Sequence, residues 1–348
     1  MNTATAEAPR KTARTDGNQT PILEIENLHI SFYTRAGEIP AVMDFSCKVM
    51  PGESMGIVGE SGCGKSTVAL GIMRDMGNRG HIKSGKIRFK GRDMGEMSDA
   101  ELRHLRGSKI AMIYQEPMAS LNPAMKIGRQ LMEVPIIHEN VSKDEAWTRS
   151  LEMLEAVRLP DPERLMRSFP HQLSGGQQQR AVIARALVLK PDFVVCDEPV
   201  SALDVSIQAQ VINLLRDMQQ RYGLTYLFIS HDLSVVRHSA DRIGVMYLGR
   251  LVELADGEDL FQRPLHPYTR ALIAAVPIPD PRLKRDRHLL RGDPPSPFAP
   301  PPGCHFHTRC PHAQARCRAE VPALRDTGGG HRVACHFAER LAQPEGVA

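Results

Sequence analysis

The feature that most constrains the fold of this chain is a glycine-rich loop at residues 59–67, which reads Gly-Glu-Ser-Gly-Cys-Gly-Lys-Ser-Thr. A short apolar segment at residues 55–58 precedes the loop and is typical of a buried strand, while residues 66–73 follow it with the apolar spacing of a helix. Glycines let backbone N–H groups turn inward around phosphate oxygens, and a helix N-terminus adds partial positive charge at the same point. The strand, loop and helix therefore predict an α/β unit that binds phosphates.

The loop fits the pattern G-x-x-x-x-G-K-[ST], in which two side chains have distinct roles. Lys65 should reach the β- and γ-phosphates, and the hydroxyl of Ser66 should bind Mg²⁺. A glycine-rich turn without a ligand is the alternative, and the strand and helix that flank the loop argue against it. The predicted nucleotide-binding residues of the loop are Gly59, Glu60, Ser61, Gly62, Cys63, Gly64, Lys65, Ser66 and Thr67.

Strands and helices alternate along most of the chain. Residues 22–50 read as strands, residues 118–172 as mainly helical, and residues 193–196 and 225–229 as further buried strands. This order predicts a largely parallel sheet with helices on both faces. The regularity weakens after Gly249, and we expect less regular structure from there to the end of the chain.

Composition excludes several classes of protein. Lys and Arg outnumber Asp and Glu by 44 to 40 among 348 residues, and a net charge of only +4 does not favour nucleic acid as a partner. No apolar stretch approaches the ~18–20 residues that are needed to cross a bilayer. Residues 1–20 lack the apolar centre of a secretory signal, so we expect a disordered leader there and contact with a membrane only through a partner.

Two carboxylates, Asp197 and Glu198, follow directly after the apolar segment 193–196. The first is placed to hold Mg²⁺ through water, and the second can accept a proton from an attacking water as a general base. An acidic pair after a strand is weak support by itself, since many such pairs are only solvated. Other motifs must decide whether this pair is catalytic.

The segment 173–177 reads Leu-Ser-Gly-Gly-Gln and resembles the signature of the ABC (ATP-binding cassette) ATPases. A serine and two glycines at a helix start form a second site for anions, and a serine-capped helix without a ligand is the alternative. In that family, dimerisation explains why one chain has two anion sites, because this loop caps the γ-phosphate bound to the other subunit. The residues concerned are Ser174, Gly175, Gly176 and Gln177.

Further segments follow the order of the same family, and the resemblance implies their roles. Gln115 resembles the glutamine that contacts Mg²⁺ and water, and Asp204 resembles the aspartate of the loop that crosses the dimer interface. His231 resembles the histidine that contacts the γ-phosphate, although a lone histidine at a strand end is usually structural. Phe32 or Tyr33 is expected to stack on adenine, with a position in the core as the alternative.

The resemblance covers residues 22–250 and leaves no catalytic position missing. It implies an α/β phosphate-loop core of the RecA-like type, with an antiparallel β-subdomain and an inserted α-helical subdomain. Cys63 departs from the family pattern, in which serine is commoner at that position. Nucleotide binding should survive because the loop uses backbone N–H groups, and the thiol is expected to make the site sensitive to thiol reagents.

Five segments resemble the dipeptide/oligopeptide/nickel importer group of this family, namely residues 115–123, 170–180, 266–270, 303–307 and 333–336. The resemblance implies an ATPase coupled to transport, which acts at the cytoplasmic face of the plasma membrane. Its implied partners are a second ATPase subunit in a heterodimer or homodimer, two membrane permeases and, indirectly, an external solute-binding protein. Peptides are the expected cargo. Nickel or another small solute, and a soluble ABC ATPase without a role in transport, are the alternatives.

Four of the seven cysteines lie near the end of the chain, at Cys304, Cys310, Cys317 and Cys335. Without an export signal, metal binding is favoured over disulfides. Four thiolates match a [4Fe–4S] cluster or Zn²⁺, and the spacing resembles that of some peptide-importer ATPases with a [4Fe–4S] cluster. Neighbouring histidines keep a mixed Cys/His zinc site open, and unliganded thiols are a third alternative. We expect a structural clasp more than a redox sensor.

These patterns divide the chain into three parts. The expected parts are a leader (1–20), an ATPase domain (21–250) with a helical subdomain (118–172), and a C-terminal region (251–348) with a proline-rich linker (277–303) and a cysteine cluster (304–335).

Overall fold

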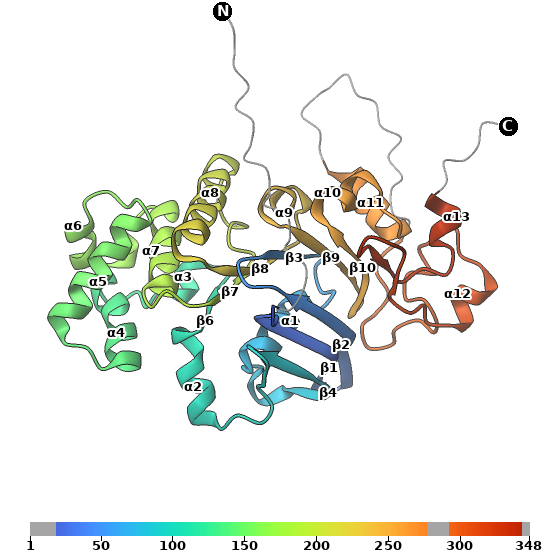
Figure 1. The fold of residues 1–348 in the computed structure, drawn as a ribbon, viewed down its shortest axis with the longest axis horizontal. Helices are drawn as coiled ribbons and strands as arrows, with labels where there is room; N and C mark the ends of the chain where they lie inside the picture. The colour runs from blue at the N-terminus through green and yellow to red at the C-terminus, as the bar shows by residue number, and fades with distance from the viewer. Residues whose placement is uncertain (1–18, 277–291, 343–348) are drawn as a thin grey trace, which may run out of the picture.

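The structure is a computed structural model that describes residues 19–276 and 292–342. Nearly all of the expected leader (1–20) lies outside the described residues, as does the first part of the expected linker (277–303). Figure 1 shows a group of helices at one end of the molecule, sheets in the centre and the C-terminal region at the other end. Within the described ranges, no helix is both long and apolar enough to cross a membrane.

The centre of the molecule is an eight-stranded mixed sheet. In spatial order its strands are β11 (Arg325–Asp326), β12 (Arg332–Val333), β10 (Arg250–Asp256), β9 (Arg242–Tyr247), β3 (Ser54–Val58), β8 (Thr225–Ser230), β7 (Phe193–Asp197) and β6 (Ile110–Ile113). The run from β9 to β6 is parallel, and the last three strands at the other edge pair antiparallel. The parallel strands are apolar and buried, as expected for strands covered on both faces. The predicted parallel sheet is confirmed.

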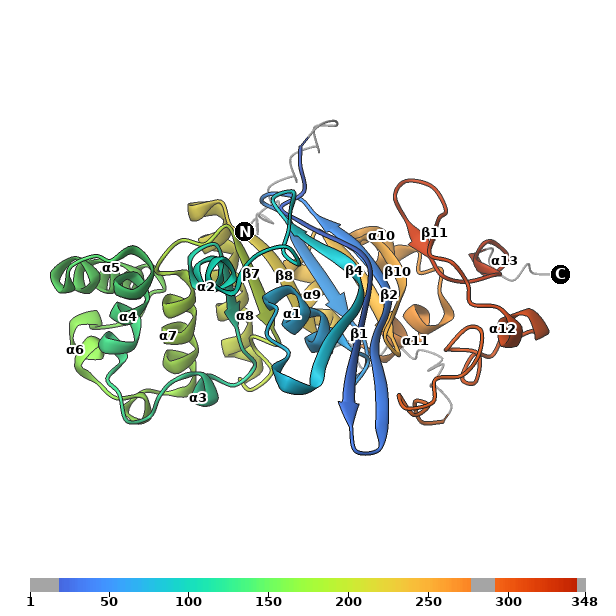
Figure 2. The ribbon, with the colours of Figure 1, turned by 90° about the horizontal axis from the view of Figure 1, so that it is seen from below.

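A second, antiparallel sheet packs beside the first. It has four strands in the order β2 (Gly37–Val49), β1 (Leu23–Thr34), β4 (Gly80–Phe89) and β5 (Arg92–Asp93). Helix α1 (Lys65–Met73) shares one hydrophobic core with both sheets, because Val68 and Ile72 lie in the same buried cluster as Ile30 and Ile57. This shared core holds the start of α1, and hence the glycine-rich loop, in a fixed place between the sheets (Figure 2).

The helical end of the molecule contains the elements that were predicted within residues 118–172. These are α3 (Pro117–Ser120), α4 (Ile127–Glu139), α5 (Lys143–Ala156), α6 (Pro162–Arg167) and the 3₁₀ turn η2 (Pro170–Gln172). Serine caps explain some of the boundaries, since the hydroxyl of Ser142 accepts a hydrogen bond from the N–H of Glu145 at the start of α5. Helix α7 (Gly175–Leu187) joins this end to the sheet, because Ile183 and Leu187 share a buried cluster with Val194.

The remaining helices cover the sheet or belong to the C-terminal region. They are η1 (Gly77–Arg79), α2 (Asp99–Ser108), α8 (Val205–Tyr222), α9 (Leu233–Ser239), α10 (Gly257–Gln262), α11 (Pro267–Ala275), α12 (Ala315–Ala319) and α13 (Ala338–Ala342). Helix α8 begins after Asp204 and ends at Gly223, whose φ of 65° is readily adopted by glycine. No helix or strand was predicted at the positions of α2 and β4.

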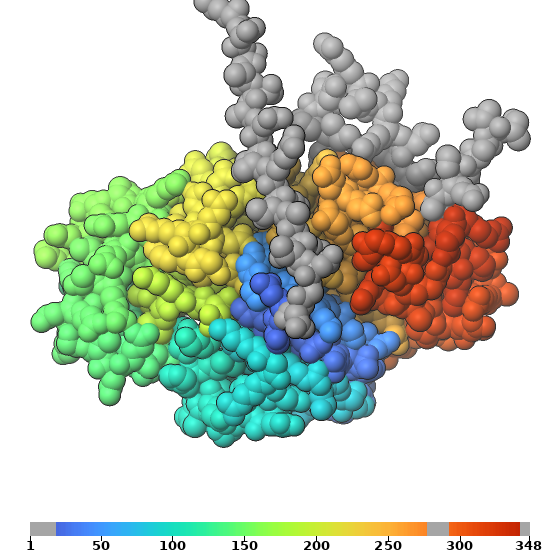
Figure 3. Space-filling view, viewed as in Figure 1, coloured from blue at the N-terminus to red at the C-terminus, as the bar shows by residue number. Residues whose placement is uncertain are grey.

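The expectation that regular structure weakens after Gly249 is wrong for residues 250–275, but it holds for residues 292–342, which contain only short elements. Strand β10 extends the central sheet, α10 and α11 follow it, and β12 adds a further strand from the C-terminal region. Figure 3 shows this region packed against the rest of the molecule. Phe306 is only 1% exposed and lies in one buried cluster with Tyr247 and Tyr268. The region therefore shares a buried core with the central sheet.

A buried carboxylate on β10 joins segments of the C-terminal region that are far apart in the sequence. Glu253 is 0% exposed and accepts hydrogen bonds from the backbone N–H groups of Leu265 (2.6 Å) and His266 (3.0 Å). The ring of His331 lies 2.7 Å from Glu253 Oε1 through Nε2 and 2.8 Å from Asp259 Oδ2 through Nδ1. Burial alone would lower the pKa of His331, but the hydrogen bonds to the two carboxylates outweigh burial and raise this pKa above its ordinary value. The protonated imidazole is thus the form that the fold stabilises.

This network predicts a pH-dependent stability. Because the folded-state pKa of His331 is raised, its contribution is full below the unfolded-state pKa of about 6.5 and is lost as pH rises through the folded value. His331→Gln should lower the free energy of unfolding by about 3 kcal/mol at pH 6 and by less at pH 8, since it leaves a buried carboxylate without its cation. Urea melts at both pH values measure this. The exposed His81→Gln is the control, and an equal loss at both pH values would contradict the assignment.

Candidate functional site

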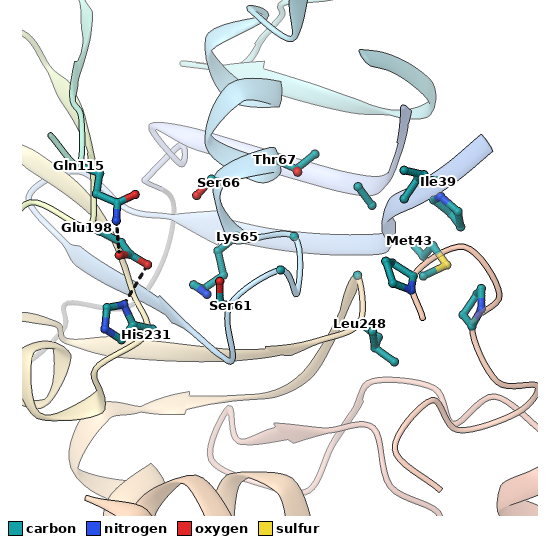
Figure 4. Close-up of a pocket in the computed structure, with 17 residues that line it drawn as sticks. Ile39, Met43, Ser61, Lys65, Ser66, Thr67, Gln115, Glu198, His231 and Leu248 are labelled. Carbon is teal, nitrogen blue, oxygen red and sulfur yellow. Dashed lines mark hydrogen bonds and ion pairs between the residues drawn. The ribbon is translucent and has the colours of Figure 1, made fainter. Parts of the chain in front are cut away.

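Four neighbouring parallel strands end at the same edge of the central sheet. The glycine-rich loop follows β3, Gln115 comes two residues after β6, Glu198 follows β7, and His231 follows β8. Ligands of open α/β sheets bind at the carboxyl ends of the strands, and a cavity of about 470 Å³ lies there. In Figure 4, Gln115, Glu198 and His231 gather on one side of this cavity, and apolar side chains lie on the other. The strand order therefore brings together the loop and three residues that are far apart in the sequence.

The glycine-rich loop is held tightly around the ammonium group of Lys65. Nζ of Lys65 donates to the carbonyl oxygens of Gly59 (2.8 Å) and Glu60 (3.0 Å), and the residue is only 4% exposed. Gly64, which precedes α1, has a φ of 104°, and a Cβ there would lie 2.3 Å from the carbonyl oxygen of Ala41. Only glycine fits this position, since both the backbone conformation and the space exclude a side chain.

Cys63 differs from the expectation that its thiol is reactive. The residue is 4% exposed, and burial raises the pKa of its thiol although the nearby Lys65 ammonium lowers it. Because the thiolate is the nucleophile, a buried thiol with a raised pKa reacts slowly. The expected sensitivity of this site to thiol reagents is therefore not supported by its surroundings.

Ser66 and Asp197 form a hydrogen-bonded pair of polar side chains beside the loop. The hydroxyl of Ser66 donates to Oδ1 of Asp197 at 3.0 Å. The pKa of Asp197 is raised above its ordinary value, mainly by burial and also by the charge of Glu198, although the hydrogen bond from Ser66 lowers it. A bound cation would stabilise the ionised carboxylate. Two protein oxygens suit Mg²⁺, which usually keeps water and phosphate oxygens in its remaining positions.

Glu198 is oriented by two donors that come from other strands. Nε2 of Gln115 donates to Oε2 of Glu198 at 3.1 Å, and Nδ1 of His231 lies 3.0 Å from Oε1 (Figure 4). The backbone of Glu198 has a φ of 48°, a left-handed conformation that is uncommon for a residue with a side chain. Such strain is found at functional sites, where the surrounding structure enforces it. Here it aims the carboxylate into the cavity, which Glu198 lines.

The apolar side of the cavity is not formed by the predicted aromatic residues. Neither Phe32 nor Tyr33 lines it, since Phe32 packs against the buried core and the ring of Tyr33 lies 5.6 Å from the ring of His81. Neither residue therefore belongs to this wall, and the stacking of one of them on adenine stays a prediction. The wall contains Ile39, Pro40, Ala41, Met43, Leu248, Pro297 and Pro300. Alternation along β2 could not have indicated this wall, because the pairing of β2 with β1 shifts register between Pro40 and Val42.

The predicted segment 174–177 and Asp204 lie away from this cavity. Ser174 caps α7, because its hydroxyl accepts from the N–H of Gln177 and the Gln177 side chain accepts from the N–H of Ser174. Gly175 and Gly176 form the first turn of α7, and Asp204 precedes α8 on the exposed surface. Ser174 to Gln177 thus form a capped helix start that does not line the chain's own cavity.

The four cysteines of the C-terminal region line one small cavity, together with His266, His307, His312 and His336. Burial raises the pKa of Cys304 and of Cys310 to about 11, and neighbouring cysteines add to the rise. Across the described residues, no group of three or more His, Cys, Asp or Glu side chains is arranged closely enough to hold a metal ion. The thiols are therefore gathered as predicted, but not drawn together as ligands.

Comparison with known families and proteins agrees with this geometry. The family described as ABC transporter matches residues 42–201, and the family described as oligopeptide/dipeptide transporter, C-terminal region, matches residues 252–317. A putative peptide import ATP-binding protein of Brucella ovis is 50% identical, over 91% of this chain and 98% of that protein. The oligopeptide transport ATP-binding protein AppF of Bacillus subtilis is 46% identical, over 93% of this chain and 99% of that protein.

Solved structures of ABC cassettes have the same fold. The ATP-binding cassette MJ0796, in a dimeric post-hydrolysis state with ADP and phosphate, gives a TM-score of 0.60 at 28% identity and covers 67% of this chain and 98% of that one. The cassette cbiO1 of Clostridium perfringens gives 0.60 at 27% identity, over 70% and 91% of the two chains. The predicted ABC ATPase fold is confirmed, and ATP and Mg²⁺ are the ligands that it implies. With this fold and with 50% identity to a relative over 91% of its length, the chain belongs to the ATP-hydrolysing subunits of the ABC transporter family.

Proposed function

We propose that this ATPase energises a membrane importer for dipeptides or oligopeptides. The observation that carries the proposal is the convergence of the phosphate loop, Glu198, Gln115 and His231 on one cavity, which supplies the chemistry of ATP hydrolysis. The names of the relatives from Brucella ovis and Bacillus subtilis support peptides as the cargo. The match of residues 252–317 to the C-terminal region of oligopeptide/dipeptide transporters supports the same cargo class.

The two sides of the cavity suit the two parts of ATP. The phosphates lie in the glycine-rich loop, where backbone N–H groups and the start of α1 attract negative charge. Lys65 turns from the carbonyl oxygens of Gly59 and Glu60 to the β- and γ-phosphates. The adenosine packs on the apolar wall around Met43 and Leu248. Ser66, Asp197 and Gln115 would hold Mg²⁺, which neutralises charge on the phosphates.

Glu198 is the general base of this proposal. Its carboxylate accepts a proton from water while the water oxygen bonds to the γ-phosphorus and the bond to the leaving ADP oxygen breaks. Gln115 and His231 hold the carboxylate in place by the contacts of 3.1 Å and 3.0 Å. His231, which lines the cavity, would also contact the γ-phosphate.

The residues outside the cavity serve a second subunit. Ser174 to Gln177 would cap the γ-phosphate bound to a partner ATPase, and Asp204 would lie at the interface between the two chains. The MJ0796 cassette, which is dimeric in its post-hydrolysis structure, supports this arrangement. We propose a heterodimer or homodimer beneath two permeases at the cytoplasmic face of the plasma membrane, fed by an external binding protein. The helical subdomain (118–172) of the ATPase domain (21–250) would contact the permeases.

The C-terminal region (251–348) would hold a metal centre in its cysteine cluster (304–335). A [4Fe–4S] cluster needs four thiolates, and Cys304, Cys310, Cys317 and Cys335 line one cavity, where they would move closer together to bind it. Zn²⁺ is the alternative, with the neighbouring His307 and His312 as further donors. The centre would crosslink a region that has few regular elements, so a structural role is favoured.

Replacing the general base separates binding from hydrolysis. Glu198→Gln should keep ATP affinity while lowering the rate of hydrolysis by about 10²–10⁴-fold, because the amide cannot accept the proton. ATP titration and phosphate release in the assembled transporter measure the two effects. Glu152→Gln, at an exposed position of α5, is the matched control. Hydrolysis at the normal rate in the Glu198 variant would show that another group is the base.

The cargo is tested in cells that carry the same substitution. A chromosomal Glu198→Gln allele should abolish uptake of labelled dipeptides and oligopeptides and leave nickel uptake unchanged, because only the peptide importer loses its motor. Uptake assays with both cargoes measure this, and the Glu152→Gln allele is the control. Loss of nickel uptake alone would favour the nickel alternative, and no effect on either cargo would favour an ATPase without a role in transport.

Metal analysis tests the cysteine cluster. Protein purified without oxygen should contain about four iron and four sulfide per chain and absorb broadly in the visible range. Cys310→Ser should remove most of the iron, whereas Cys47→Ala, at a buried position outside the cavity lining, should not. Zinc without iron would contradict the cluster in favour of a zinc site, and protein free of both metals would contradict a metal centre.

A further inference from the structure

The glycine-rich loop is bonded to the C-terminal region through the side chain of Glu60. Both terminal nitrogens of Arg309 donate to the Glu60 carboxylate, with Nη1 2.7 Å from Oε2 and Nη2 3.1 Å from Oε1. The Arg309 side chain is only 6% exposed. The two residues are 249 positions apart in the sequence, so this bidentate pair exists only because the C-terminal region folds against the loop. Paired hydrogen bonds of this kind fix both distance and orientation.

A second bond holds the backbone of the same residue. The N–H of Glu60 donates to the hydroxyl of Tyr268 at 2.9 Å, and Tyr268 is fully buried. The ring of Tyr268 packs at 4.7 Å from that of Tyr247 and at 5.4 Å from that of Phe306. The guanidinium of Arg309 lies 5.9 Å from the centre of the Tyr247 ring. The packing of these three rings thus fixes the hydroxyl of Tyr268 and the guanidinium of Arg309, which both bind Glu60.

The carbonyl group of Glu60 contacts the lysine that is proposed to bind the nucleotide. Its carbonyl oxygen accepts a hydrogen bond from Nζ of Lys65 at 3.0 Å. The N–H, the carboxylate and the carbonyl of Glu60 are therefore bonded to Tyr268, Arg309 and Lys65 in turn. A shift of Glu60 would therefore move the loop backbone and the ammonium group of Lys65, both of which are proposed to bind the phosphates.

Charge makes the pair with Arg309 important for binding. Glu60 is a carboxylate within a loop that binds a polyanion, and an unpaired negative charge there would repel phosphates. Arg309 neutralises it in a place that is partly shielded from water. Among the described residues none accepts a hydrogen bond from Nε of Arg309, so the carboxylate of Glu60 is the main compensation for this buried cation.

We propose that Arg309 and Tyr268 are positioning residues of the nucleotide site. They fix Glu60, cancel its charge and so make the C-terminal region a working part of the ATP site, beyond any role in transport or metal binding. This inference rests on the proposed function only in that ATP is the ligand of the loop.

ATP titration of the purified full-length chain tests the proposal. Arg309→Met should weaken ATP binding about tenfold, because the unpaired carboxylate of Glu60 repels the phosphates and the loop loses an anchor. Glu60→Gln combined with Arg309→Met should recover most of that loss, since both charges are gone. Arg316→Met, which breaks the exposed pair of Arg316 with Glu320 in the same region, is the matched control and should bind ATP like the wild type.

Recovery in the double variant is the result that a merely structural pair would not produce. Equal ATP affinity in folded Arg309→Met and wild type would overturn the proposal, as would a loss that the double variant does not relieve. If Arg309→Met does not fold, Tyr268→Phe decides, because it keeps the ring and removes only the hydroxyl that accepts from Glu60. Weaker ATP binding by that variant supports the proposal, and unchanged binding overturns it. Failure of the wild type to bind ATP would instead contradict the proposed function.

Discussion

Parallel pairing among β3, β8, β7 and β6 brings four distant segments of the chain to one edge of a sheet. These strands are apolar and largely buried, so their backbone N–H and C=O groups find partners mainly in the neighbouring strands. All four run in one direction, and their carboxyl ends therefore carry the phosphate loop and the residues of the cavity to the same place. The chemistry of the site depends on this strand order more than on any single contact within it.

The C-terminal region is joined to that sheet by three different kinds of interaction. Strand β12 pairs with β10, Phe306 packs into an aromatic cluster, and Arg309 pairs with Glu60 of the phosphate loop. Each interaction removes an unfavourable free energy. An unpaired sheet edge, an exposed aromatic ring and an unpaired buried charge would all destabilise the fold. The C-terminal region is thereby fixed to the central sheet, and its packing can affect the phosphate loop directly.

Neighbouring carboxylates in this site have different surroundings. Asp197 is the last residue of β7, and its partner is the hydroxyl of Ser66. Glu198 turns away through a left-handed backbone conformation and meets Gln115 and His231 instead. One step along the backbone thus separates a carboxylate suited to a cation from one suited to a proton.

Sequence alone determined the phosphate loop, the candidate catalytic residues and the fold, because local patterns and the order of motifs carry that information. Even the capping box of Ser174 and Gln177 could be read from four letters, although its lack of contact with the chain's own cavity could not. Tertiary structure decided which side chains form the apolar wall, and it placed Phe32 against the core instead. It also decided the pairing of Glu60 with Arg309, since contacts between residues so far apart arise from packing and leave no local pattern in the chain.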